Sequence, residues 1–180
     1  MKIYLVGFMG SGKTTIGREL ANRIEAPFFD LDELIESAEK MTIREIFAQR
    51  GEPYFRKRER DLLRSTKHLE SAVIATGGGT FTFDENIQFI QSEGLSVYLS
   101  AAYSLLRSRI GSKDDRPLFR DDLSTHELYA NRIRYYRMSD LTIDVREEET
   151  PAEIVERLML ELPKNVLDAA RRTSSPGRRP

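Results

Sequence analysis

Short apolar runs alternate with helix-compatible segments along most of the chain. The runs cover residues 2–6, 27–29, 73–75, 95–99 and 141–145. Apolar runs separated by helical segments are typical of parallel strands that are joined by helical crossovers. The run at 27–29 is the weakest strand candidate, because it is short and opens with Pro27. The pattern therefore predicts an α/β fold with a parallel sheet.

Several helix starts are marked by capping residues. The capping-box pattern, in which Ser or Thr is followed three residues later by Glu, occurs at Thr42 with Glu45, Ser124 with Glu127, and Thr150 with Glu153. Pro151 takes the favoured first position of the last of these helices. Asp84 is predicted to be the N-cap of a helix that runs to about residue 93. Residues 53–70 are predicted to form a longer helix.

Two segments depart from this alternation. Residues 111–123 (GSKDDRPLFRDDL) are polar, charged and interrupted by Pro117, which predicts an exposed loop. Residues 164–180 end in RRTSSPGRRP, which cannot bury a core, and we expect this tail to be disordered. No linker indicates a second domain. We therefore expect one domain over residues 1–163, followed by a basic tail.

Composition adds mainly exclusions. The chain has no cysteine, which excludes disulfides, thiolate metal sites and cysteine nucleophiles. Its formal net charge of -1 gives no general attraction to nucleic acid or anionic membranes, and the four tail arginines would add only weak, salt-sensitive contacts. No apolar run approaches the roughly 20 residues that span a bilayer, and residues 3–6 are too short for a signal-peptide core. We expect a cytoplasmic monomer that binds neither nucleic acid nor membrane.

Residues 7–14 (GFMGSGKT) match the phosphate-binding pattern G-x-x-x-x-G-K-[ST]. An apolar run precedes the pattern, and a helical pattern over residues 13–24 follows it, as such a loop requires. Glycines let backbone N–H groups wrap the phosphates closely, and the helix points its positive end at them. Lys13 is predicted to reach the β- and γ-phosphates, and the Thr14 hydroxyl to ligate Mg²⁺. The alternative, a chance glycine-rich turn, fits neither the complete pattern nor its flanks.

Further motifs narrow the choice of phosphate acceptor. They are Phe29-Asp30-Leu31-Asp32, Phe55-Arg56-x-x-Glu59, Thr76-Gly77-Gly78-Gly79, Arg116-Pro117-Leu118 and Arg132-x-x-x-Tyr136. In this order and spacing, over about residues 2–162, the sequence resembles the shikimate kinase family. The resemblance implies a three-layer sandwich of the P-loop NTPase, nucleoside-monophosphate-kinase-like type, with a five-stranded parallel sheet. It also implies transfer of the γ-phosphate of ATP to the 3-hydroxyl of shikimate, a step toward chorismate and the aromatic amino acids.

The resemblance also implies roles for individual residues. The nucleotide side would comprise Gly10, Ser11, Gly12, Lys13, Thr14, Thr15, Arg109, Arg116 and Pro151, with Lys13 and Arg116 also catalytic. Arg109 matches the family position that stacks on adenine. The acceptor side would comprise Asp32, Arg56, Glu59, Gly77, Gly78, Gly79 and Arg132. Thr14 and Asp30 would support Mg²⁺.

Asp30 and Asp32 follow the second apolar run. Side chains alternate along a strand, so we expect both carboxylates to point the same way, toward the carboxyl edge of the sheet. Asp32 would accept hydrogen bonds from the acceptor hydroxyls and is a candidate to take the proton of the attacking hydroxyl. The phosphate itself is the other candidate for that proton. Asp32 could also cap the following helix.

Arg56 and Arg132 are the predicted clamp for a substrate carboxylate, since a guanidinium fork matches a carboxylate in bidentate fashion. Glu59 lies one helical turn after Arg56 and could hold that guanidinium, or could form an ordinary surface pair with it. Arg134 is the rival of Arg132, which we prefer because it keeps the spacing to Tyr136.

Two rival functions remain open at this point. Another small P-loop kinase could act on a different sugar acid or on a nucleotide, although the two arginines and the triple glycine favour shikimate. A catalytically inactive nucleotide-binding module would usually have lost Lys13, the metal ligands or Arg116.

The resemblance yields a prediction for Arg116 in the polar loop. If Arg116 contacts the γ-phosphoryl group mainly as charge builds in the transition state, Arg116→Ala should lower kcat strongly and change substrate binding little. An arginine finger contributes about 10³–10⁵ in rate, which is an upper guide because Lys13 remains. Arg116→Lys should rescue only partly, because a point charge lacks the planar fork. Steady-state kinetics with ADP affinity by calorimetry test this, and an unchanged kcat would contradict it.

Overall fold

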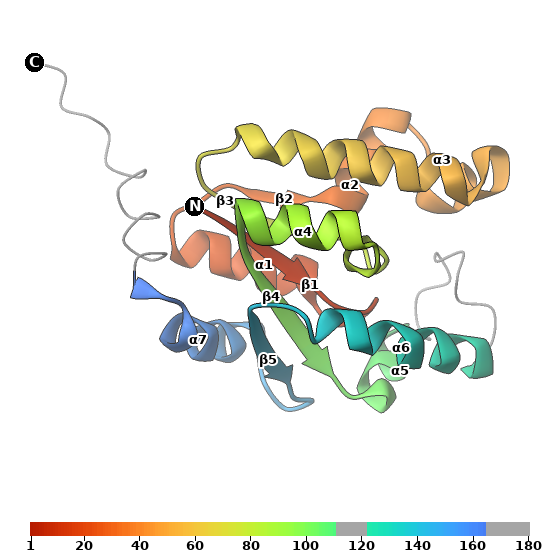
Figure 1. Ribbon diagram of the computed structural model, residues 1–180. Coiled ribbons are helices and arrows are strands. Elements are labelled where there is room, and N and C mark those ends of the chain that lie inside the picture. The colour runs from red at the N-terminus through yellow and green to blue at the C-terminus, as the bar shows by residue number, and fades with distance from the viewer. Residues whose placement is uncertain (111–121, 165–180) are drawn as a thin grey trace, which may run out of the picture.

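The computed structural model describes residues 1–110 and 122–164, and these form one parallel sheet with helices on both faces (Figure 1). The strands are β1 (Lys2–Val6), β2 (Phe28–Asp30), β3 (Ala72–Ala75), β4 (Gly94–Ala101) and β5 (Leu141–Val145). Their spatial order is β2-β3-β1-β4-β5, and every neighbouring pair is parallel. The predicted α/β fold with a five-stranded parallel sheet is confirmed.

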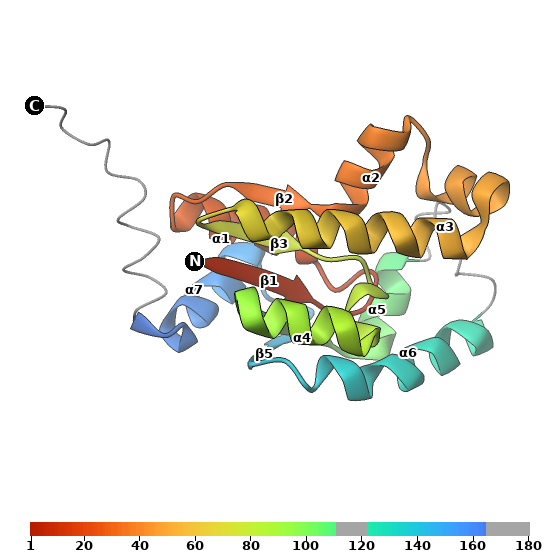
Figure 2. The ribbon, with the colours of Figure 1, turned by 45° about the horizontal axis from the view of Figure 1, so that its top comes forward.

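The helices divide between the two faces of the sheet. They are α1 (Lys13–Arg23), α2 (Leu31–Glu39), α3 (Ile43–Ser65), α4 (Asp84–Glu93), α5 (Tyr103–Ile110), α6 (Asp122–Tyr136) and α7 (Pro151–Glu161), with short 3₁₀ turns η1 (Thr66–His68) and η2 (Thr80–Thr82). Figures 1 and 2 show α1 and α7 side by side on one face and α3, α4 and α6 on the other. The result is the three-layer arrangement that the resemblance implied.

The central strand β1 is buried along its whole length, because helices cover both faces of the sheet. Its first residue, Lys2, is nevertheless charged. The Lys2 ammonium donates to the carbonyls of Thr66 (3.2 Å) and Lys67 (3.1 Å) and pairs with Glu93 at 2.8 Å. The strand therefore begins with a satisfied charge and continues as an apolar run.

The sheet order creates a crevice at its carboxyl edge. Strands β1 and β3 are neighbours in the sheet. From β1 the chain crosses over to β2 on one side, and from β3 it crosses over to β4 on the other side, so the direction of the connections reverses between β1 and β3. Ligands of open α/β sheets bind at such a switch point. The weakest predicted strand, β2, forms only three residues at the sheet edge, where it pairs with β3.

Four of the predicted helix boundaries can be compared with the structure. The capping boxes at Thr42 and Thr150 are both present. The prediction for Ser124 is wrong, because it lies inside α6, two residues after Asp122. Asp84 is the first residue of α4 rather than its N-cap, which is Phe83. An acidic residue also stabilises the first turn of a helix through the macrodipole, so the sequence signal did not separate these two positions.

The long helix α3 differs from the predicted helix over residues 53–70. Gly51 has φ 80° and breaks α3 into two parts, and the second part ends at Ser65, five residues earlier than predicted. A left-handed φ is readily accessible to glycine, which explains the break. The Thr66 hydroxyl donates to the Leu63 carbonyl at 2.6 Å and closes the last turn.

The predicted loop at 111–123 and tail at 164–180 fall largely outside the described residues. Asp122 and Leu123 belong to α6, and Lys164 is the last residue that the structure describes. Within residues 1–110 and 122–164, no helix is long and apolar enough to cross a membrane.

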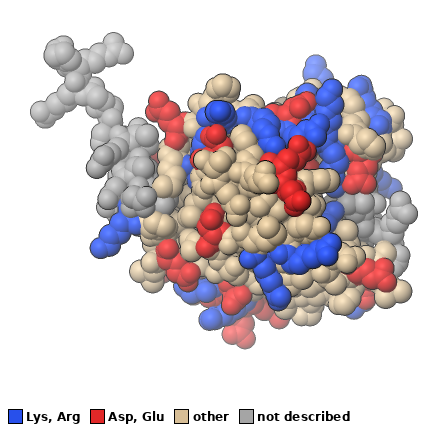
Figure 3. Space-filling model, in the orientation of Figure 1, with Lys and Arg blue, Asp and Glu red and all other residues tan. Residues whose placement is uncertain are grey.

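On the face drawn in Figure 3, acidic and basic side chains lie beside one another. This matches surface pairs such as Arg60–Glu85 at 2.9 Å.

Candidate active site

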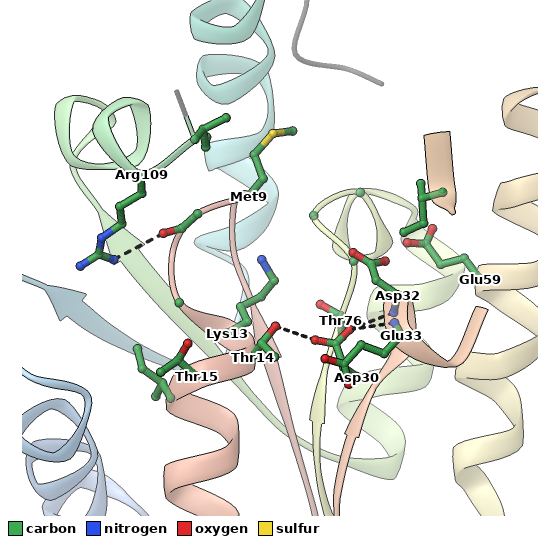
Figure 4. A pocket seen from close by; sticks show the side chains of 18 of the residues that line it. Met9, Lys13, Thr14, Thr15, Asp30, Asp32, Glu33, Glu59, Thr76 and Arg109 are labelled. Carbon is green, nitrogen blue, oxygen red and sulfur yellow. Dashed lines mark hydrogen bonds between the residues drawn. The ribbon is translucent and has the colours of Figure 1, made fainter. Parts of the chain in front are cut away.

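A cavity of about 770 Å³ opens at the carboxyl edge of the sheet, where the loops after β1, β2 and β3 meet (Figure 4). The predicted site residues that line it are Gly10, Gly12, Lys13, Thr14, Thr15, Asp30, Asp32, Arg56, Glu59, Gly77, Gly78, Gly79, Arg109, Arg132 and Pro151. Ser11 is buried and does not line the cavity. Arg116 lies outside the described residues. One cavity thus gathers segments that are far apart in the sequence.

The phosphate-binding pattern forms a tight loop between β1 and α1. Gly12 is the N-cap of α1 with φ 95°, a left-handed conformation that favours glycine. The Lys13 ammonium donates to the carbonyls of Gly7 and Phe8, both at 2.9 Å, and Lys13 is only 8% exposed. Lys13, the first residue of α1, therefore connects that helix to the first residues of the loop, and its ammonium group lies at the cavity wall.

Thr14 and Asp30 meet at the floor of the cavity. The Thr14 hydroxyl donates to Asp30 Oδ2 at 2.6 Å (Figure 4). Asp30 Oδ1 accepts from the backbone N–H groups of Asp32 (2.9 Å) and Glu33 (3.4 Å), so Asp30 is the N-cap of α2. The alternative role of helix cap, considered for Asp32, belongs to Asp30.

Asp30 and Asp32 do not lie on one strand, so the prediction that strand alternation points them the same way is wrong. Strand β2 ends at Asp30, and Asp32 already lies in the first turn of α2, where period-two alternation does not apply. Both carboxylates still line the cavity, because α2 begins directly where the strand ends. Figure 4 shows Asp30 and Asp32 on one side of the phosphate loop and Arg109 on the other.

The Thr14–Asp30 pair fits a divalent cation such as Mg²⁺. A hydroxyl that donates its proton to a carboxylate keeps its lone pairs for a ligand. Mg²⁺ prefers oxygen ligands and is usually held by one or two protein groups, with water and phosphate oxygens completing the octahedron. No cluster of three or more His, Cys, Asp or Glu ligands occurs in the described part of the chain.

Arg56 lines the cavity and is held from several sides. Its Nε and Nη2 donate to Glu52 Oε1 at 3.1 and 3.0 Å, and its Nη1 donates to Glu59 Oε2 at 2.8 Å. The guanidinium also lies 5.1 Å from the ring centre of Phe55 and 5.8 Å from that of Phe83. Burial acts to lower the pKa of Arg56, but the two glutamates outweigh it and raise the pKa.

Glu59 is not an ordinary surface partner of Arg56. It is 1% exposed, and its second oxygen, Oε1, accepts a hydrogen bond from the Thr80 hydroxyl at 2.6 Å. A buried charge is tolerated only when it is paired and hydrogen-bonded, and Glu59 meets both conditions. The structure therefore excludes the surface-pair alternative.

The register of α6 separates Arg132 from Arg134. Arg132 is 9% exposed and lines the cavity, whereas Arg134 is exposed and lies over the ring of its neighbour Tyr135. One turn later, the Tyr136 hydroxyl donates to the Gly78 carbonyl at 2.5 Å, and burial raises the pKa of Tyr136. The Arg132-x-x-x-Tyr136 motif thus connects α6 to the triple glycine.

Two of the three glycines after β3, Gly77 and Gly79, are needed for close approach. A Cβ atom on Gly77 would lie 2.4 Å from Glu59 Oε1 and 2.9 Å from Asp32 Oδ1. On Gly79, it would lie 2.6 Å from the Arg56 guanidinium. None of the three has a positive φ, so conformational freedom is not the reason for glycine here.

Sequence reasoning missed Thr80 and part of the cavity wall. Thr80 directly follows the glycines and is buried behind the wall, where its hydroxyl reaches Glu59. Ile43, Phe47 and Phe55 form an apolar part of the wall. The spacing of Ile43 and Phe47, four residues apart on a capped helix, carried a signal that both face the same way. The apolar wall could not be assigned to the cavity without the packing of α3 against α2.

Comparisons with known proteins agree with this geometry. The family model described as shikimate kinase matches residues 9–163. The chain belongs to the shikimate kinase family. The shikimate kinase of Aquifex aeolicus is 36% identical over 168 residues, covering 93% of this chain and 99% of that protein. The shikimate kinase of Ruegeria pomeroyi is 39% identical, covering 92% and 88%.

Solved structures of this family share the fold in detail. The Acinetobacter baumannii shikimate kinase in complex with shikimate superposes with a TM-score of 0.84 at 34% identity, covering 88% of this chain and 90% of that one. The resemblance inferred from five motifs is therefore confirmed, together with the P-loop kinase fold.

The close packing at the glycines makes a testable prediction. Gly77→Ala should lower the free energy of unfolding by about 1–3 kcal/mol, because the methyl group would overlap Glu59 and Asp32. Gly78→Ala is the matched control, since a Cβ there meets nothing closer than 3.5 Å. It should leave stability unchanged or raise it by less than about 1 kcal/mol. Urea unfolding of both variants measures this, and equal midpoints would refute the packing argument.

Proposed function

We propose that this protein transfers the γ-phosphate of ATP to the 3-hydroxyl of shikimate, giving ADP and shikimate 3-phosphate. The observation that carries the proposal is that a phosphate-binding loop, the partly buried Arg56 and the buried Arg132 line a single cavity. A phosphate donor and a carboxylate-bearing acceptor can therefore be held side by side. Membership of the shikimate kinase family supports the same reaction.

The nucleotide side rests on the loop before α1. Backbone N–H groups of residues 10–15 and the positive end of α1 suit the phosphates. Lys13, already at the cavity wall, would pair with the β- and γ-phosphates. Arg109, whose Nη1 lies 3.4 Å from the Gly10 carbonyl, and Pro151 line the same cavity and would contact the adenosine.

The Thr14 hydroxyl oxygen would bind Mg²⁺ directly. Asp30 would support the ion by fixing the Thr14 hydroxyl through their hydrogen bond, or by binding a water ligand of the ion. When bound, it would neutralise charge on the phosphates. The residues themselves orient this site: Asp30 is fixed by its capping bonds at the start of α2, and the Thr14 hydroxyl is fixed by Asp30.

The acceptor side uses Arg56 and Arg132 for the carboxylate of shikimate. Arg56 has five N–H donors, of which three are engaged by Glu52 and Glu59. The described residues leave one donor on each Nη for a ligand. Asp32 and the backbone of Gly77–Gly79 would orient the hydroxyls.

The reaction forms a bond between the acceptor oxygen and the γ-phosphorus and breaks the bond between that phosphorus and the β,γ-bridging oxygen. The proton of the hydroxyl passes to Asp32 or to an oxygen of the transferred group. Catalysis of this transfer is mostly positioning and electrostatic stabilisation, which the charged cavity wall supplies. The family assignment also leads us to propose that the protein is a cytoplasmic monomer. Gel filtration tests the oligomeric state.

A coupled ADP-release assay tests the reaction. Shikimate should support turnover, whereas other sugar acids and nucleoside monophosphates at the same concentration should not. Preferred phosphorylation of a different acceptor would overturn the substrate assignment while leaving the kinase class intact.

The two neighbouring arginines of α6 give a sharper prediction. Arg132→Ala should raise the KM for shikimate far more than that for ATP, because it leaves the carboxylate desolvated and unpaired. The loss should be on the order of 2–4 kcal/mol. Arg134→Ala, on the exposed side of the same helix, should be mild. Steady-state kinetics of both variants decide the matter, and exchanged phenotypes would show that the helix register is wrong.

A further inference from the structure

Thr80 lies in the turn that follows the triple glycine, and its hydroxyl bonds to Glu59 of the acceptor site. It is the first residue of η2, immediately after the triple glycine, and is 0% exposed. Its hydroxyl donates to Glu59 Oε1 at 2.6 Å, and the other oxygen of Glu59 accepts from Arg56 at 2.8 Å. Thr80, Glu59 and Arg56 thus form a continuous chain that ends in the cavity.

The Glu59 carboxylate depends on this arrangement because water does not reach it. At 1% exposure it must be satisfied by protein donors, and Arg56 and Thr80 supply one on each oxygen. Glycine at position 77 allows the backbone to approach Oε1, where a Cβ would lie at 2.4 Å. The carboxylate therefore sits in a slot formed by the Gly77 backbone, the Thr80 hydroxyl and the Arg56 guanidinium.

Thr80 is itself held in place from both sides. Its N–H donates to the Gly77 carbonyl at 3.2 Å, and its carbonyl accepts from Asn86 Nδ2 at 3.1 Å. Asn86 is buried in the first turn of α4. The hydroxyl is thus presented to Glu59 from a turn anchored to α4, not from a mobile surface residue.

We propose that Thr80 is a positioning residue of the acceptor site, which sets the affinity for the substrate carboxylate by fixing Glu59 and, through it, Arg56. This rests on the proposed function. Without the hydroxyl, Glu59 Oε1 loses its charge-assisted hydrogen bond and the carboxylate is free to turn. Arg56 then keeps only its hydrogen bonds to Glu52, whose side chain is 50% exposed, and the two N–H groups left for the substrate lose part of their alignment.

The test is Thr80→Val, which keeps the shape of the side chain and removes the donor. The KM for shikimate should rise about tenfold or more, the range expected for a lost hydrogen bond to a charged group. The values of kcat and of the KM for ATP should stay within about twofold, because the lost alignment is in acceptor binding. Calorimetric titration with shikimate should show the same loss of affinity. Thr80→Ser retains the hydroxyl and should behave as the wild type.

Two controls separate positioning from general damage. Thr66→Val removes another buried hydroxyl, one that bonds Tyr4 (2.8 Å) and the Leu63 carbonyl (2.6 Å) at the far end of α3. It should lower the unfolding temperature without changing the KM for shikimate. In an Arg56→Ala background, Thr80→Val should have almost no further effect on kcat/KM, because the residue through which Thr80 acts is gone.

The outcomes distinguish the inference from the proposed function. A wild-type protein that does not phosphorylate shikimate overturns the proposed function. A wild-type protein that does so, with an unchanged KM in Thr80→Val, or with additive effects of Thr80→Val and Arg56→Ala, overturns the positioning role. If Thr80→Val does not fold, Thr80→Ala makes the same comparison with less crowding at the carboxylate, and an unchanged KM in it is equally decisive.

Discussion

A carboxylate buried away from water has to be matched on both of its oxygens, and Glu59 imposes this requirement on the part of the cavity around Arg56. Arg56 meets it on one side and Thr80 on the other. The pairing in turn forces the backbone at Gly77 to lie where no side chain fits. Charge pairing and close packing here are therefore consequences of one buried group, and the proposed binding of the substrate carboxylate by Arg56 depends on the same group.

The parallel sheet places this arrangement beside the nucleotide site. Strands β1, β2 and β3 all end at the same edge, so the phosphate loop, the Asp30–Asp32 segment and the triple glycine lie around one cavity. The helices after β1 and β2 also contribute to the cavity. Helix α1 directs its positive end at the phosphate-binding loop, and α2 is capped by Asp30, which also accepts a hydrogen bond from Thr14. The same residue thus supports both the fold and the proposed metal site.

Much of the site could be predicted from local patterns. The phosphate loop, the strands and the capping boxes at Thr42 and Thr150 depend on residues within a few positions of one another, and such short-range interactions are visible in a sequence. The preference for Arg132 over Arg134 followed from its spacing to Tyr136, and the structure places only Arg132 at the cavity. The predicted N-caps Asp84 and Ser124 instead lie inside their helices, as the first residue of α4 and the third of α6, because several polar residues at a helix start satisfy the same pattern.

The sequence by itself determined the kind of chemistry: a phosphate-binding loop after a buried strand, carboxylates after the next strand, and arginines at a recognisable spacing. Tertiary structure alone decided how these groups are held. That Glu59 is buried and not on the surface, and that the Thr80 hydroxyl bonds to it, depend on contacts between segments distant in the chain. Glu59 and Thr80 are 21 residues apart, and only the packing of α3 against the turn after β3 brings the hydroxyl to the carboxylate.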